Sequence, residues 1–91
     1  MARLKLGVLI SGRGTNLQAL LDATADPEFP AETALVLSNR ADAAGLERAR
    51  RAGVPTAAID HKAYPDRPSF EAAMNAALEA ASVDLVCLAG F

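Results

Sequence analysis

The sequence predicts an α/β fold, a Rossmann-like parallel sheet of four strands with helices on both faces. Short apolar runs alternate with segments of helical periodicity along the 91 residues, and this alternation specifies a parallel sheet with right-handed crossovers. The first run does not alternate with polar residues, which suits a parallel strand covered on both faces. The glycines that follow it allow a tight turn from strand into helix. We expect a single domain over residues 1–91.

Four apolar runs are of strand length and are bounded by residues that favour turns. The predicted strands cover residues 4–10, 33–37, 56–59 and 85–89. The chain thus stops at the carboxyl end of its fourth strand, and ligands of open parallel sheets bind just beyond such ends. We therefore expect a fragment, or the ordered part of a longer protein, with the sheet truncated at the end of the fourth strand.

Two helical segments lie between the first three strands. The first opens at Asn16 and ends by Asp26, because a residue that precedes proline is displaced from the α region. The second covers about residues 42–52, where Glu47 and Arg51 form an i,i+4 pair on the outer side.

A third helix is predicted after a loop over residues 61–68. In and beside this loop, Asp60 and Asp66 are interpreted as turn and cap residues. The helix itself carries one apolar stripe, as expected when one face packs against a sheet. The stripe consists of Phe70, Met74, Ala77, Leu78 and Ala81.

Charge argues against a nucleic-acid partner. The formal net charge is −2, which gives no electrostatic basis for binding a polyanion. The cations cluster only at Arg48, Arg50 and Arg51, which alternate with Ala and Glu at helical spacing. This cluster is predicted to be a solvated helix face.

The single cysteine and the single histidine allow neither a disulfide nor a metal cluster. Cys87 lies in an apolar run and is predicted to be a buried structural thiol, whereas His61 is predicted to be a solvated loop residue. No apolar run reaches the roughly 18 residues that a membrane span needs, and no leader pattern opens the chain. We expect a cytoplasmic protein without a membrane partner, and the sequence leaves a homodimer open.

The loop after the first strand is predicted to hold a phosphate group. Gly12 and Gly14 let the backbone approach a ligand closely, and the first N–H groups of the following helix have no intrahelical partner. The helix dipole adds about half a positive charge there. Thr15 and Asn16 can add side-chain donors, and either could cap the helix. The competing interpretation is a tight turn without a ligand.

A dinucleotide fingerprint fits the loop less well. Leu17 stands where that fingerprint has its third glycine. The second strand leads into Ser-Asn-Arg rather than into an acidic residue suited to a ribose hydroxyl. Arg40 is able to serve a 2′-phosphate, so binding of NADP stays open. The Walker pattern is absent, because no Lys-Ser/Thr pair follows the glycines.

Three blocks resemble the phosphoribosylglycinamide formyltransferase family, folate-dependent enzymes of purine synthesis. They are residues 9–19 (LISGRGTNLQA), 38–49 (SNRADAAGLERA) and 88–91 (LAGF). Their order and spacing match the family along the whole chain, which corresponds to about the first half of the family's catalytic domain. Three blocks in register are far more specific than the glycine loop alone.

The resemblance implies transfer of a formyl group from the co-substrate 10-formyltetrahydrofolate to the amine of glycinamide ribonucleotide, without a metal. Gly14, Thr15 and Asn16 match the segment that binds the ribonucleotide phosphate. Arg67 matches an arginine that contacts the folate, and Phe91 begins the segment that lines the folate pocket. The family's catalytic Asn, His and Asp all lie after that segment, so none is expected among these 91 residues.

Two other functions compete with the transferase. Formyltetrahydrofolate hydrolase shares the fold but transfers the formyl group to water, and it usually carries an N-terminal regulatory domain. The block at 38–49 and the direct start on a strand favour the transferase. A pure NADP- or nucleotide-binding module is the alternative from a different functional class.

Overall fold

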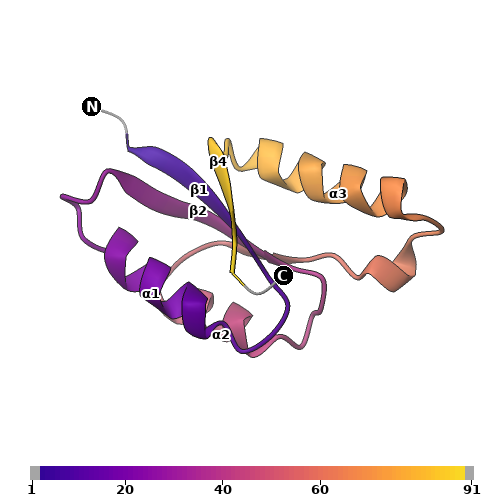
Figure 1. Ribbon diagram of the computed structural model, residues 1–91, viewed down its shortest axis with the longest axis horizontal. Helices are drawn as coiled ribbons and strands as arrows, with labels where there is room; N and C mark the ends of the chain where they lie inside the picture. Colours follow the sequence, from indigo (N-terminus) through magenta and orange to yellow (C-terminus); the bar gives the residue numbers. More distant parts are fainter. Residues whose placement is uncertain (1–2, 90–91) are drawn as a thin grey trace.

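A computed structural model of the protein describes residues 3–89. A four-stranded parallel sheet lies between two layers of helix (Figure 1). The strand order is β3-β2-β1-β4, and all three neighbouring pairs are parallel. The predicted fold class is confirmed. The strands are β1 (Leu4–Ile10), β2 (Ala31–Ser38), β3 (Thr56–Ala58) and β4 (Leu85–Leu88).

The helices cover opposite faces of the sheet. Helices α1 (Thr15–Thr24) and α2 (Ala44–Arg51) lie on one side and α3 (Arg67–Ala80) lies on the other (Figure 1). A short 3-10 helix, η1 (His61–Ala63), precedes α3. None of the helices in residues 3–89 is long and apolar enough to cross a membrane.

Alternate residues of the central strands β1 and β2 belong to two separate apolar clusters, because successive side chains of a strand point to opposite faces of the sheet. Val8 and Val36 pack with the side chains of α1 and α2. Leu9 and Leu37 pack instead with Phe70 and the rest of the apolar stripe on α3. Both faces of β1 and β2 are therefore buried, as the uninterrupted apolar runs predict.

Strand β4 is less buried than the sequence predicts. No strand of residues 3–89 lies beyond it, so β4 forms an edge of the sheet. The exposed fraction of Leu88 is 70%. Cys87 is half-buried, which corrects the prediction of a buried thiol.

The helix and strand boundaries differ from the predicted ones by a few residues. Strand β2 begins earlier, at Ala31, because Ala31 pairs with Leu4 of β1. Helix α3 begins at Arg67, inside the predicted loop, and Pro68 lies in its first turn, where a missing N–H costs no hydrogen bond. Asp66 caps this helix by accepting a hydrogen bond from the Ser69 backbone N–H at 2.8 Å, as predicted.

The chain changes direction across the sheet after β3. Strands β2 and β3 extend from one side of β1, and α3 then carries the chain across the opposite face to β4, on the other side of β1. The connections that leave the carboxyl ends of β1 and β3 therefore pass over opposite faces. Such a topological switch point is where open α/β sheets bind their ligands.

Candidate functional site

The predicted phosphate loop lies at this switch point. Residues 11–14 join the carboxyl end of β1 to α1, beside the end of β4. A hollow of about 130 Å³ opens here. It is lined by Gly12, Arg13, Gly14, Thr15, Asn16 and Ala89. The structure thus brings together the three residues predicted to bind the substrate.

Helix α1 begins without a side-chain cap. Its N-cap is Gly14, in the left-handed region with φ +77° and ψ 30°, so the prediction that Thr15 or Asn16 caps the helix is wrong. Both residues instead belong to the first turn, and both side chains are exposed. The Gly14 carbonyl accepts the Gln18 N–H at 2.9 Å, which leaves the N–H groups of the first turn without a helical acceptor.

The electrostatics of this helix end favour an anion. The first turn of α1 contains no acidic residue, so no carboxylate neutralises the positive end of the helix dipole. Exposed hydroxyl and amide groups at Thr15 and Asn16 add neutral donors. The arrangement can bind a phosphate by hydrogen bonds alone.

Two glycines let α2 approach the loop closely. A Cβ on Gly14 would lie 2.7 Å from the Cα of Gly45, and a Cβ on Gly45 would lie 3.1 Å from the Cα of Gly14. The Gly45 N–H also donates to the Gly12 carbonyl at 3.0 Å. Sequence reasoning missed Gly45, although a glycine in the first turn of a helix is itself a signal of close packing.

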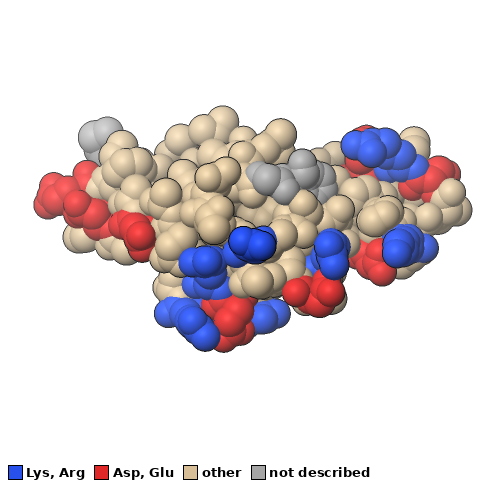
Figure 2. Space-filling model, turned by 60° about the horizontal axis from the view of Figure 1, so that its bottom comes forward, with Lys and Arg blue, Asp and Glu red and all other residues tan. Residues whose placement is uncertain are grey.

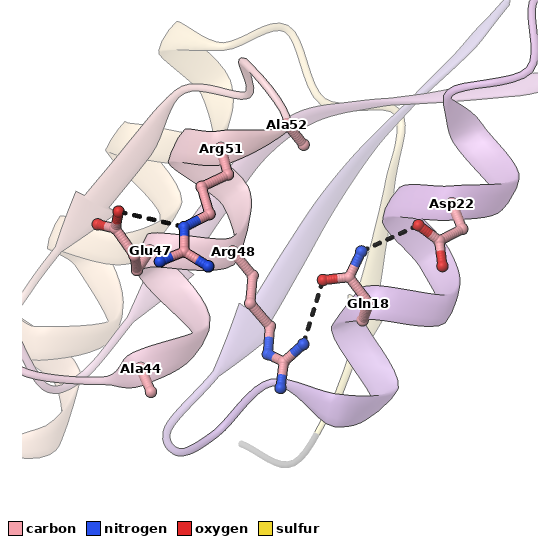
Figure 3. A pocket seen from close by; sticks show the side chains of 7 residues that line it. All are labelled: Gln18, Asp22, Ala44, Glu47, Arg48, Arg51 and Ala52. Carbon is pink, nitrogen blue, oxygen red and sulfur yellow. Dashed lines mark hydrogen bonds and ion pairs between the residues drawn. The ribbon is translucent and has the colours of Figure 1, made fainter.

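Arg48 bonds to the same loop. Its Nε donates to the Arg13 carbonyl at 2.9 Å, and its Nη1 donates to the Gln18 Oε1 at 3.2 Å. Figure 3 shows the side chain reaching from α2 towards α1. The prediction of a solvated face is therefore wrong for Arg48, which is half-buried. It is confirmed for Arg50 and Arg51, which are exposed and pair with Glu47.

Positive and negative side chains are mixed over the face of the molecule that Figure 2 shows. Figure 2 shows Lys and Arg side chains in several separate groups, most of them beside Asp or Glu. Within residues 3–89, no group of three or more His, Cys, Asp or Glu side chains gathers where it could hold a metal ion.

Arg67, the predicted folate contact, borders a different hollow. That hollow has a volume of about 430 Å³ and shares no lining residue with the phosphate loop. The Arg67 side chain is 79% exposed and pairs with Glu71 at 3.0 Å. The other lining residues are Asn39, His61, Tyr64, Asp66 and Phe70. Phe91, the other predicted folate contact, lies outside the described residues.

Aromatic packing forms the floor of this second hollow. The Phe70 ring lies 6.1 Å from the ring centres of both His61 and Tyr64. His61 remains half exposed in η1, as predicted for a solvated loop histidine. The buried Oδ1 of Asn39 has no hydrogen-bond partner among the described residues. The lining of the hollow therefore includes an apolar aromatic surface and the Arg67 cation.

The Asp66 carboxylate in this hollow has a structural partner. Hydrogen bonds from the Ser69 backbone N–H, and then from the Ser69 hydroxyl, hold the pKa of Asp66 below its ordinary value of 3.8. Asp66 is thus an ionised helix cap. The role of Asp66 as a cap residue agrees with the prediction from the sequence.

The model of the formyl transferase family matches residues 4–91 of the sequence. The chain belongs to the formyl transferase family. It is 44% identical over 87 residues to the phosphoribosylglycinamide formyltransferase of Haemophilus influenzae, a match that covers 96% of this chain and 41% of that protein. It is 52% identical over 87 residues to the trifunctional purine biosynthetic protein adenosine-3 of Homo sapiens, of which 9% is covered.

Solved structures of the family share the fold. The glycinamide ribonucleotide transformylase 1 of Symbiobacterium toebii is 56% identical, with a TM-score of 0.93 over 98% of this chain and 42% of that one. The phosphoribosylglycinamide formyltransferase of Brucella melitensis is 39% identical, with a TM-score of 0.96 over 99% and 47%. The chain is similar to the N-terminal portion of these proteins and spans less than half of their length.

Proposed function

We propose that the hollow at the start of α1 binds the phosphate of glycinamide ribonucleotide. The observation that carries the proposal is the uncapped helix end at the switch point, where Gly14 turns the backbone and leaves Thr15 and Asn16 exposed. The N–H groups of this turn, the helix dipole and two side-chain donors all favour one anionic group.

The hollow has room for one phosphate group but not for a whole ribonucleotide or dinucleotide. Its volume is about 130 Å³, whereas pockets that enclose drug-sized ligands measure roughly 300–1,000 Å³. Arg40 does not decide against NADP, because its pair with Asp42 at 3.3 Å is exposed and costs little to release.

We further propose that the chain contributes to formyl transfer from 10-formyltetrahydrofolate to the ribonucleotide amine. The names of the similar proteins, phosphoribosylglycinamide formyltransferases, favour this reaction over hydrolysis to water. Arg67 is proposed to contact the folate from the rim of the second hollow, next to its aromatic floor. Its exposed pair with Glu71 costs little to release. Phe91 keeps its proposed place beside the folate.

The proposed contribution of this chain is positioning. A fixed phosphate places the amine at the far end of the ribonucleotide against the formyl donor, and such fixing supplies several kcal/mol of a barrier. The catalytic Asn, His and Asp that the family resemblance implies do not match positions in these 91 residues. We therefore propose that the chain alone binds the ribonucleotide without transferring the formyl group, so binding is the activity to measure.

Calorimetric titration tests the proposal with three ligands. We expect glycinamide ribonucleotide to bind, and we expect glycinamide riboside, which lacks the phosphate, to bind at least about tenfold more weakly, because it loses several charge-assisted hydrogen bonds. NADPH should not compete. Equal affinity for ribonucleotide and riboside would overturn the phosphate site, and tight NADPH binding would support a dinucleotide module instead.

A further inference from the structure

Helix α2 holds the backbone of the phosphate loop from behind. Two consecutive loop carbonyls accept hydrogen bonds from it: the Gly12 oxygen from the Gly45 N–H at 3.0 Å, and the Arg13 oxygen from the Arg48 Nε at 2.9 Å. The C=O and N–H of a trans peptide unit point in opposite directions. These two bonds therefore turn the N–H groups of Arg13 and Gly14 away from α2.

The hollow lies on the side to which those N–H groups turn. It is bordered by Ala89, just after β4, and β4 lies on one side of β1. Helix α2 follows β2, on the other side of β1. The bonds between α2 and the loop carbonyls thus direct the N–H groups of Arg13 and Gly14 towards the hollow. These donors add to the free N–H groups in the first turn of α1.

We propose that Arg48 is a positioning residue that holds this loop in its anion-binding conformation. The inference rests on the proposed function, in which the loop binds a phosphate. The guanidinium suits the task because its donors point in fixed directions. One arm bonds to the loop through Arg13, and the other bonds to α1 through Gln18. A single side chain thereby fixes the loop relative to the helix whose end forms the site.

The bond to α1 is itself supported. Gln18 donates from its Nε2 to the Asp22 Oδ1 at 2.9 Å, one turn further along α1. Figure 3 shows Arg48, Gln18 and Asp22 as a continuous chain of hydrogen bonds across the groove between the two helices. The hydrogen bond to Asp22 fixes the orientation of the Gln18 side-chain amide. Its other atom, Oε1, therefore faces Arg48 and accepts the hydrogen bond.

Among the arginines of α2, Arg48 alone bonds to the loop and to α1 within residues 3–89. Arg50 and Arg51 both pair with Glu47 and are mostly exposed. Within residues 3–89, Arg48 has no carboxylate at ion-pair distance, and the loop acceptor is a neutral carbonyl. Arg48 can therefore favour a bound anion in two ways. It holds the loop by hydrogen bonds, and it carries a positive charge that no carboxylate neutralises. A lysine would keep the charge and lose the two-armed geometry.

Three variants separate geometry from charge. Arg48→Lys keeps the charge, Arg48→Met removes both charge and bonds, and Arg50→Met removes the same charge from the same helix without touching the loop. For each, we measure the affinity for glycinamide ribonucleotide and for glycinamide riboside by calorimetry. Hydrogen exchange of the Gln18 backbone N–H, which donates to the Gly14 carbonyl, is measured by NMR without ligand.

If Arg48 positions the loop, Arg48→Lys loses about tenfold in ribonucleotide affinity, the effect of one charge-assisted hydrogen bond. Arg48→Met, which also loses the charge, should lose at least as much. The riboside affinity of both variants should not change, and their Gln18 backbone N–H should exchange faster than in the wild type. Arg50→Met should stay within about twofold of the wild type, because an exposed charge is strongly screened. A general loss of folding would weaken both ligands equally.

Wild-type affinity and wild-type exchange in Arg48→Lys would overturn the positioning role and leave only an effect of charge. Absence of ribonucleotide binding by the wild type would instead overturn the proposed function of the loop. In that case unchanged Gln18 exchange in both Arg48 variants would also overturn the structural part of this inference.

Discussion

Gly14 and Gly53 have nearly the same positive φ, +77° and +75°, but different surroundings. A Cβ on Gly53 would meet no atom within 4 Å, whereas a Cβ on Gly14 would lie 2.7 Å from the backbone of Gly45. Gly53 is therefore required only for its conformation. Gly14 is required for its conformation and for the contact between the phosphate loop and α2.

Substitution of these two glycines by alanine should separate strain from contact. Gly53→Ala should lower the free energy of unfolding by about 1 kcal/mol, the cost of a left-handed alanine. Gly14→Ala should lower it by about 2–4 kcal/mol, because overpacking adds to the same strain, and it should abolish ribonucleotide binding. Urea unfolding and calorimetry measure both effects. Equal destabilisation and intact binding in the two variants would show that α2 does not constrain the loop.

At the residue scale, the sequence predicted which residues line the hollow better than it predicted which residues support the loop. Gly14, Thr15 and Asn16 meet at one hollow, as expected from the order of strand, loop and helix. The role of Arg48 was missed because its partners, Arg13 and Gln18, are 35 and 30 residues away in the chain. Helical spacing alone cannot distinguish a solvated arginine from one that reaches a neighbouring loop.

At the element scale, the start of α3 shows how a local signal fits two interpretations. Proline at position 68 was interpreted as part of a loop, yet it lies in the first turn of α3, after the cap residue Asp66. Local sequence fits both interpretations, because proline is tolerated in loops and in first turns alike. The aspartate two residues earlier is the signal that identifies the helix start.

The cap of α3 should make stability depend on pH in acid. The pKa of Asp66 is lower in the folded chain than its ordinary value of 3.8. Its stabilising contribution is therefore complete above that value and is lost as the pH falls through the lowered folded pKa. Asp66→Ala should melt a few degrees below the wild type at neutral pH, because it loses the cap. The difference should become smaller in strong acid, where the wild type loses the part of the stabilisation that depends on ionisation.

Asp66→Asn is the matched control, since asparagine is an equally good cap and carries no charge. It should melt near the wild type at neutral pH and should lack the acid-dependent part of the difference. Melting curves recorded by circular dichroism from neutral pH to about pH 2 provide the measurement. An Asp66→Ala deficit that is constant over this range would contradict the ionised cap.

At the scale of the whole molecule, the sequence predicted layers and strand direction but not the burial of each strand. Alternating strands and helices specify a parallel sheet, whereas the edge position of β4 depends on which side of β1 it joins. Cys87 was predicted to be buried because its run is apolar, and it is half-buried because β4 is an edge strand. The same topology places the proposed phosphate loop at the switch point.

A crystal structure of the chain with glycinamide ribonucleotide would show directly where the phosphate binds. We expect the phosphate in the hollow between the loop and the end of β4, with its oxygens within about 3.2 Å of backbone N–H groups of residues 14–16. We also expect the Arg48 bond to the Arg13 carbonyl to be retained in the complex. A ribonucleotide bound with its phosphate elsewhere, such as in the hollow beside Arg67, would contradict the proposed site.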